Sequence, residues 1–272
     1  MASENVRNYL EDYIAEIQSG GKLYFTLDDI KNKYRSNYDT AIKFSLNKLF
    51  KKGKIVSVYK GFYIIIPPEY QQRKILPVEL FIDALFKFLG RPYYLGLSSA
   101  AIMHGASHQQ VMESYIIINK PPIRTTKVEG LKINYAVKSI MPKYGIEKRK
   151  TDTGYINISG AELTAVDLVE YQNRIGGVNR AATVLFELSD SMKKEKLLEL
   201  LNNDISLSVL QRLGYILDVV LNKKELSAII KNYLDEKRIF RVALKPDAKK
   251  EGYKVHPGWQ IIENYKIETD FK

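Results

Sequence analysis

Apolar residues recur at helical spacing in the first fifty positions and predict three consecutive helices. The apolar positions of the first helix are Val6, Leu10, Tyr13, Ile14 and Ile17, and the pair Gly20-Gly21 ends it. A short second helix begins where Thr26 is followed three residues later by Asp29, as in a capping box, and it continues through Leu27 and Ile30. Ser36 and Asp39 repeat this spacing before the third helix.

The third helix has two different faces. Its predicted core positions are Ile42, Leu46, Leu49 and Phe50, and its polar positions are Thr40, Lys43, Asn47 and Lys51. Gly53 ends the helix, and two β-rich runs follow, KIVSV and FYIII, with Tyr59-Lys60-Gly61 as the turn between them. Three helices followed by a hairpin are the order of a winged helix-turn-helix.

The positive charge of this N-terminal region predicts that its partner is a polyanion. Residues 31–60 hold nine Lys or Arg and one acid, Asp39, which gives a net charge of +8 (nine minus one) within a chain of +11. In a winged helix-turn-helix the third helix enters the major groove and the hairpin tip reaches the flanking backbone or minor groove. We expect base contacts from Ser36, Asn37, Tyr38, Thr40 and Lys43, with Asn37 and Asn47 suited to adenine. We expect phosphate contacts from Lys33, Arg35, Lys51, Lys52, Lys54 and Lys60. The alternatives are a solvated basic face or a protein-interaction module.

The pattern changes after the hairpin, which indicates a second domain. PPEYQQRKILP, residues 67–77, is rich in proline and polar residues and predicts a linker over 71–77. The chain then divides into a winged helix-turn-helix over 1–70 and a larger domain over 78–272, and the fold class is α+β. The larger domain has a helix closed by Gly90, strand-like runs at 114–119 and 131–137, three helices after Lys193 and closing strands around Trp259, which we expect to be a partly buried anchor.

Three stretches of this second domain resemble one known family. They are PYYLGLSSAAIMHGASHQQ at 92–110, ISGAELTAVDLVEYQNRIGGVNRAATVLFEL at 158–188 and LQRLGYILDVV at 210–220. Together with the N-terminal winged helix, they are similar to the AbiEi antitoxins of abortive-infection toxin-antitoxin systems. The resemblance spans nearly the whole chain and implies a mixed α/β C-terminal antitoxin domain with a helical portion.

The resemblance also implies a function and its partners. It implies a transcriptional autorepressor that binds inverted repeats of double-stranded operator DNA in the promoter of its own type IV operon. The second partner is a nucleotidyltransferase-like toxin, which the antitoxin neutralises without a stable complex. Two alternatives stay open: direct protein-protein binding to the toxin with the winged helix as scaffold, and an enzyme acting on the toxin or its target. A homodimer or two cooperative monomers would both fill an inverted repeat.

The sequence offers little for catalysis, metals or cofactors. The chain has no cysteine, which removes thiolate chemistry and cysteine-ligated zinc. His104 and His108 have a metal-like spacing but no carboxylate nearby, and a helix-end role is favoured. Glu113 with Lys120 lacks the converging acids that a nuclease needs, because Asp83, Asp152, Glu162 and Asp167 have no matching spacing. Glu162 and Asp167 are expected at a helix start and on the surface. We predict no enzyme, no metal and no cofactor.

Further basic residues follow in the second domain. One cluster is Lys120, Arg124, Lys127 and Lys132, and another is Lys138, Lys143, Lys148, Arg149 and Lys150. A second nucleic-acid surface is the functional interpretation, with Lys120, Arg124, Lys127, Lys132, Lys148, Arg149 and Lys150 as its candidates, and solvated loops are the alternative. No secretory leader and no apolar run of the roughly 20 residues needed for a membrane span are evident, so we expect a cytoplasmic protein without membrane contact.

Overall fold

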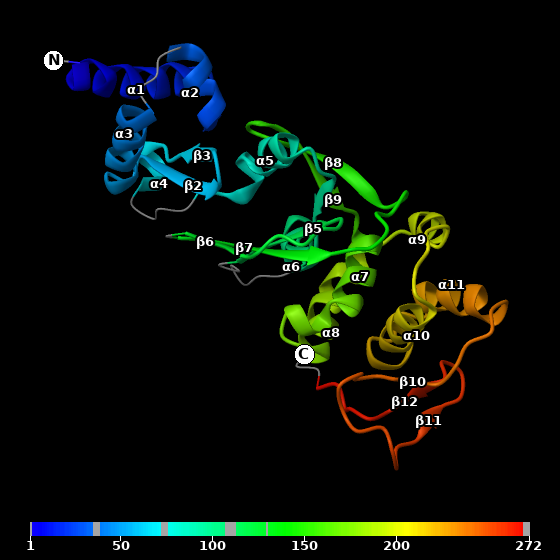
Figure 1. Cartoon of the computed structure of the whole chain (residues 1–272). Coiled ribbons are helices and arrows are strands. Elements are labelled where there is room, and N and C mark those ends of the chain that lie inside the picture. The colour runs from blue at the N-terminus through cyan, green and yellow to red at the C-terminus, as the bar shows by residue number, and fades with distance from the viewer. Residues whose placement is uncertain (1, 35–38, 72–75, 107–112, 129, 269–272) are drawn as a thin grey trace.

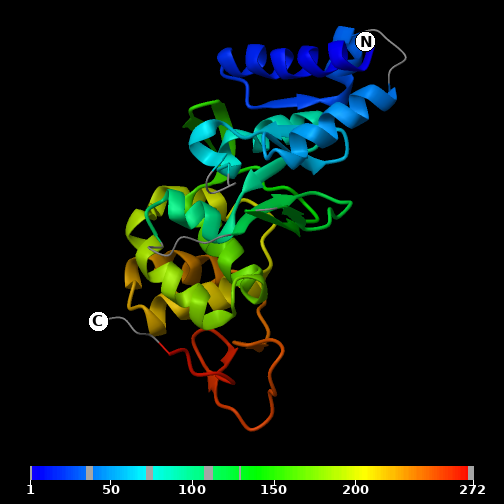
Figure 2. The same ribbon diagram turned by 90° about the vertical axis from the view of Figure 1, so that its left-hand side faces the viewer.

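The computed structural model describes residues 2–34, 39–71, 76–106, 113–128 and 130–268. It is a mixed α+β structure, as the sequence predicts, and Figures 1 and 2 show its N-terminal helices and its C-terminal strands at opposite ends of the molecule. Within the described ranges, every helix is too short or too polar to cross a bilayer.

The N-terminal part contains the three predicted helices and the predicted hairpin. Its elements are α1 (Ala2–Ser19), β1 (Tyr24–Thr26), α2 (Leu27–Tyr34), α3 (Asp39–Lys51), β2 (Ile55–Tyr59) and β3 (Phe62–Ile65). β1, which the sequence pattern missed, pairs antiparallel with β3, and the sheet order is β1-β3-β2. The strand is only three residues long, which is too short for a clear alternation.

Local chemistry sets the boundaries of these helices. The Thr26 amide donates to the Asp29 carboxylate at 2.9 Å, and the Asp29 amide donates to the Thr26 hydroxyl at 3.0 Å, so the predicted capping box is confirmed. Gly53 follows α3 with φ of +66°, a left-handed conformation that glycine adopts without a Cβ penalty. The corresponding prediction for Ser36 and Asp39 lies outside the described residues.

α3 packs on the N-terminal core through a narrower stripe than the sequence predicts. Ile42, Leu46 and Leu49 are buried, but Phe50 is 53% exposed, so its prediction as a core residue was wrong. At 100° per residue Phe50 lies on the solvent side of Leu46, beyond the contact with α1. Ser45 is buried on the other side of the stripe.

A six-stranded mixed sheet forms the centre of the second part. Its strands are β4 (Tyr93–Leu95), β5 (Glu113–Ile118), β6 (Thr126–Val128), β7 (Leu131–Val137), β8 (Ile146–Thr151) and β9 (Gly154–Ser159). Their order is β6-β7-β5-β4-β9-β8, with β5 and β7 parallel and with β4 and β9 parallel. The two predicted strands are confirmed as β5 and β7. The prediction that Tyr93, Tyr94 and Leu95 are core residues is also confirmed, since they form the short inner strand β4 and are buried.

Helices complete the second part. They are α4 (Pro68–Gln71), α5 (Ile82–Leu89), α6 (Leu97–Met103), α7 (Ala161–Glu170), α8 (Val178–Leu188), α9 (Lys194–Leu200), α10 (Leu207–Tyr215) and α11 (Lys224–Asp235), with short 3-10 turns η1 (Val78–Leu80), η2 (Gln172–Arg174) and η3 (Ser189–Ser191) and a π-helical turn η4 (Ile216–Val220). The last strands, β10 (Val242–Ala243), β11 (Val255–His256) and β12 (Ile261–Ile262), form a small separate sheet.

The N-terminal sheet is buried on both faces and joins the two parts through one apolar core. Phe62 and Ile64 of β3 share a buried cluster with Phe86 of α5 and Ile116 of β5, whereas Ile65 packs with the N-terminal helices. Leu76, inside the predicted linker, is 1% exposed and belongs to this shared core. Residues 72–75 lie outside the described residues, and the division of the chain at 71–77 stays a prediction.

Trp259 closes the C-terminal part of the core. It is 3% exposed, more deeply buried than the partly buried anchor that the sequence predicts. Its indole Nε1 donates to Asp218 at 2.8 Å, and the ring lies against the backbone of Gly214 in α10. Arg212, two residues before Gly214, donates its Nε to the Ala243 carbonyl at 2.8 Å, so this half-buried cation is bound by a backbone carbonyl.

Candidate nucleic-acid interface

The solvent face of α3 gathers four of the predicted DNA-contacting residues. Thr40, Lys43, Asn47 and Lys51 are exposed and repeat every three or four positions, so they share one side of the helix. Among the described residues, Lys43 and Lys51 belong to no ion pair. Phe44, which is 55% exposed, lies on the same side of the helix. The sequence analysis did not include it in this face, because the face was predicted from polar residues alone.

Other predicted phosphate-contacting lysines already have acidic partners. The Lys33 ammonium pairs with Glu16 and lies 4.6 Å from the centre of the Tyr13 ring. Lys52 and Lys54 both pair with Glu11 of α1, at 3.1 and 3.4 Å. Their hydrogen bonds and charge, Lys52 foremost, lower the pKa of the Glu11 carboxyl. Pairs this exposed are weak, so a phosphate can replace the carboxylate at small cost.

The hairpin turn is short and lies against the rest of the protein. The Gly61 carbonyl accepts a hydrogen bond from the Leu27 amide at 2.8 Å. A Cβ added at Gly61 would lie 3.8 Å from the Phe88 ring of α5. Lys60 is exposed at this turn. Arg35, Ser36, Asn37 and Tyr38 lie outside the described residues, so their predicted contacts have no placement.

The seven residues predicted as a second nucleic-acid surface are not gathered on one surface. β6 and β8 are opposite edges of the six-stranded sheet, which separates Lys127 from Lys148 and Lys150. Lys132 pairs with Glu113 at 2.5 Å, and Arg149 donates to the Met103 carbonyl at 3.0 Å. Lys120 and Arg124 are exposed in the loop before β6.

A buried charge network lies beside the sheet, and the sequence did not predict it. Asp167 of α7 is fully buried, so its prediction as a surface acid was wrong. Its carboxylate accepts from the Lys138 ammonium at 2.7 Å and from the Tyr94 hydroxyl at 2.8 Å. Lys138 also pairs with Glu170 at 2.6 Å. Glu162, at the predicted helix start, is buried too and accepts from the Lys193 amide at 2.6 Å.

Burial and partner charges act in opposite directions in this network. Burial opposes the charged form of Lys138, but Asp167 and Glu170 outweigh it and raise the pKa of Lys138 above its ordinary value. Burial raises the pKa of Asp167, although Lys138 and the Tyr94 hydroxyl act against that rise. Lys138 therefore stays charged, and its ion pairs connect the end of β7 to α7. We interpret the network as structural.

The residues considered for metal or nuclease chemistry have other roles. His104 Nε2 contacts the Ser159 carbonyl at 2.8 Å at the end of α6, as its helix-end prediction expects, and His108 lies outside the described residues. Glu113 begins β5 and pairs with Lys132, while Lys120 follows the other end of the strand. Within the described residues, no three His, Asp or Glu side chains gather as metal ligands.

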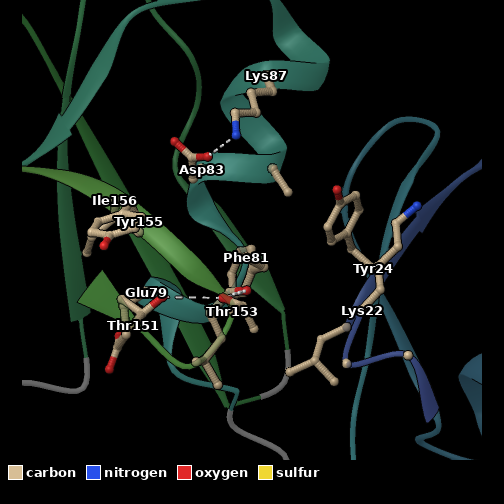
Figure 3. A pocket seen from close by; sticks show the side chains of 15 residues that line it. Lys22, Tyr24, Glu79, Phe81, Asp83, Lys87, Thr151, Thr153, Tyr155 and Ile156 are labelled. Carbon is tan, nitrogen blue, oxygen red and sulfur yellow. Dashed lines mark hydrogen bonds and ion pairs between the residues drawn. The ribbon is translucent and has the colours of Figure 1, made fainter. Parts of the chain in front are cut away.

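Two of the pockets in the described part of the chain lie beside charged side chains. One of about 740 Å³ lies between the loop at 138–143, α7 and the loop at 202–206, with Ile140, Met141 and Glu170 in its lining. A smaller one of about 270 Å³ lies between the N-terminal sheet and α5 (Figure 3), where the Tyr24 ring faces Asp83 and Lys87. Two of its charged side chains pair with each other, Lys87 with Asp83 at 2.7 Å, and the Tyr93 hydroxyl donates to Asp83 at 3.0 Å.

The fold and the basic helix face define a two-part α+β protein with an exposed cationic α3. Residues 94–219, from β4 to the π-helical turn, match the family model of the AbiEi antitoxin C-terminal domain. The match confirms, over these residues, the resemblance to the AbiEi antitoxins seen in the sequence. No curated protein matches the chain.

One solved structure shares the fold over almost the whole chain. It is the crystal structure of the RV2827C protein from Mycobacterium tuberculosis, with a TM-score of 0.60 and 16% sequence identity. The match covers 92% of this chain and 90% of that one. At this identity the likeness concerns the fold alone.

Proposed function

We propose that this protein is an AbiEi family antitoxin that binds inverted repeats in its own promoter as a winged helix-turn-helix autorepressor. The observation that carries the proposal is the exposed face of α3 with Thr40, Lys43, Asn47 and Lys51. Support also comes from the element order, three helices and a hairpin on a three-stranded sheet, which is typical of winged helices that place the third helix in the major groove.

The side chains of this face divide between readout and affinity. The Asn47 amide can donate to and accept from an adenine edge, and the exposed Phe44 ring can contact a thymine methyl group. Lys43 and Lys51 supply charge for phosphates, which gives affinity that falls with salt but little sequence preference. The short hairpin, held against α2 and α5, gives Lys60 a supporting contact at most.

Binding of the full chain to its upstream DNA tests this assignment. We expect Asn47→Ala to weaken the binding free energy for the upstream DNA by about 1–3 kcal/mol. It should also relax specificity at one base pair, because an adenine contact is removed. Lys43→Ala should weaken binding to upstream and scrambled DNA alike and reduce the salt slope by about 1. Fluorescence anisotropy at several salt concentrations measures both effects.

Matched controls separate this face from general charge. Asn232→Ala and Lys193→Ala remove an exposed asparagine and an exposed lysine from other helical regions and should leave binding unchanged. Specific binding that survives both α3 variants would remove the recognition-helix assignment. Equal losses in the controls would do the same.

We further propose that the protein neutralises a nucleotidyltransferase-like toxin without catalysis and without a stable complex. Size-exclusion chromatography of toxin and antitoxin at micromolar concentration should then give separate peaks. Co-elution would instead favour direct binding of the toxin. The pocket of about 740 Å³ is then the candidate contact site, because its lining lies entirely within the residues that match the family model. Charge reversal at Glu170 there would distort the Lys138 network, so Asp204→Lys is the better probe of that contact.

A further inference from the structure

The segment at 237–254, between α11 and β11, concentrates unbalanced positive charge. It holds seven Lys or Arg (Lys237, Arg238, Arg241, Lys245, Lys249, Lys250 and Lys254) and two acids (Asp247 and Glu251), a net charge of +5 (seven minus two) in 18 residues. It lies outside the residues that match the family domain. Figures 1 and 2 place it at the end of the molecule opposite α3, where it loops outward around β10 and β11.

These cations are available to a polyanion. In the part of the chain that the structure describes, none of the seven forms an ion pair, whereas the lysines of neighbouring α11 and its preceding turn do. Lys223 pairs with Asp190, Lys224 with Asp218 and Lys231 with Asp235. Six of the seven are exposed, and Lys245 is half-buried. A phosphate backbone could therefore bind these side chains without breaking an ion pair among the described residues.

Two exposed aromatic rings accompany the charge. Phe240 is 64% exposed, the most exposed of the large hydrophobic residues in the described ranges, and Tyr253 is 49% exposed. The Arg238 guanidinium lies 5.3 Å from the centre of the Phe240 ring, and Lys254 follows Tyr253 directly. An open ring beside a cation offers a nucleobase a stacking surface and its phosphate a counter-charge.

Buried amides hold the backbone of this segment in place. Gln211 of α10, 1% exposed, donates its Nε2 to the carbonyls of Phe240 and Trp259, both at 2.9 Å. Asn264, 5% exposed, accepts from the Lys245 amide at 3.1 Å and donates to the Lys245 and Lys249 carbonyls at 2.9 and 3.1 Å. The loop is thus ordered before any ligand arrives, which lowers the entropy lost on binding.

We propose that residues 237–254 bind single-stranded nucleic acid, with phosphates on the lysines and arginines and bases stacked on Phe240 and Tyr253. A duplex hides the faces of its bases, so a surface with exposed rings fits a single strand better than operator DNA. The inference does not depend on the α3 assignment, because the two surfaces lie at opposite ends of the molecule.

The test is anisotropy of the full chain with a labelled 20-nucleotide RNA of mixed sequence, the same sequence as DNA, and the corresponding duplex. Phe240→Ala and Tyr253→Ala should each weaken single-strand binding on the order of tenfold with little effect on the duplex. Lys249→Glu with Lys250→Glu should weaken it by at least about tenfold at low salt and reduce the salt slope. Preference for RNA over DNA would indicate a contact to the 2′-hydroxyl, and equal binding would indicate backbone and base stacking alone.

Matched variants decide the location. Tyr155→Ala removes another ring of similar exposure (58%), and Lys148→Glu with Lys150→Glu makes the same charge change on β8; both should leave single-strand affinity near wild type. Lys43→Ala with Asn47→Ala should also retain it, whatever its effect on operator DNA. Equal losses in the β8 variant, no loss in the ring variants, or tighter binding to the duplex would overturn the proposal. Thermal melting by circular dichroism confirms that each variant is folded.

Discussion

Lys138→Met is expected to lower the free energy of unfolding by about 3–5 kcal/mol, the range for removing one partner of a buried pair. The substitution keeps most of the side-chain length but leaves the fully buried Asp167 carboxylate without its ammonium partner. The Tyr94 hydroxyl remains as a hydrogen-bond donor, which cannot balance a full charge. Urea unfolding followed by circular dichroism measures the loss.

The loss should depend on pH with a definite sign. Burial already raises the pKa of Asp167, and removing Lys138 removes the charge that opposes this rise. The folded variant then binds a proton more readily than the unfolded chain, whose aspartate has a pKa of about 3.9. Its stability relative to wild type therefore recovers as pH falls toward the raised pKa and is lowest at neutral pH and above.

Two further variants test this explanation. Lys148→Met removes an exposed lysine on β8 and should change stability by less than about 0.5 kcal/mol. Lys138→Met combined with Asp167→Asn removes both charges and should regain part of the loss, because no buried charge is then unpaired. A single variant as stable as wild type, or a double variant no better than the single one, would contradict a charge-based role.

Gly214→Ala is the second substitution for which we expect a large effect on stability. It should destabilise the protein, although helix propensity alone predicts that it stabilises α10. Alanine in a helix interior is favoured over glycine by about 1 kcal/mol. At this position, however, an added Cβ would lie 2.1 Å from the nearest carbon of the Trp259 ring, and two more ring carbons lie within 2.8 Å. The indole cannot retreat easily, because it is buried and its Nε1 is bonded to Asp218.

Overpacking of this kind costs about 1–3 kcal/mol, and we expect the upper part of that range. A chain of this size should lose roughly 2–4 °C in Tm per kcal/mol. Trp259 is the only tryptophan, so its fluorescence reports the displacement directly. Ser208→Ala, in the first turn of the same helix, removes an exposed hydrogen bond to the Ser206 hydroxyl and should leave Tm nearly unchanged and the emission unchanged. An unchanged Gly214→Ala would mean that α10 and the C-terminal strands can separate without cost.

Long periodic segments and local caps could be predicted from the sequence. The three N-terminal helices, the hairpin, the Thr26–Asp29 capping box, and the strands β5 and β7 were all predicted from spacing and residue type. The edge strand β8 was missed because IEKRKT is mostly charged and polar. Its inner neighbour β9 was missed because GYINIS has only Ile156 and Ile158 as aliphatic positions among polar residues. On α3, Phe50 was assigned to the core because spacing alone cannot say how wide the contacted stripe is.

The sequence by itself determined the α+β class, the concentration of positive charge around α3 and the family resemblance, because each depends on residues that are close along the chain. Only the tertiary structure decided which charges are free. It pairs Lys33, Lys52 and Lys54 with acids of α1, and among the described residues Lys43 and Lys51 have no ion pair. It also buried Asp167 against Lys138 and placed the β6 and β8 lysines at opposite sheet edges. These outcomes depend on contacts between residues up to tens of positions apart, and side-chain spacing within one element carries no information about which distant element covers it.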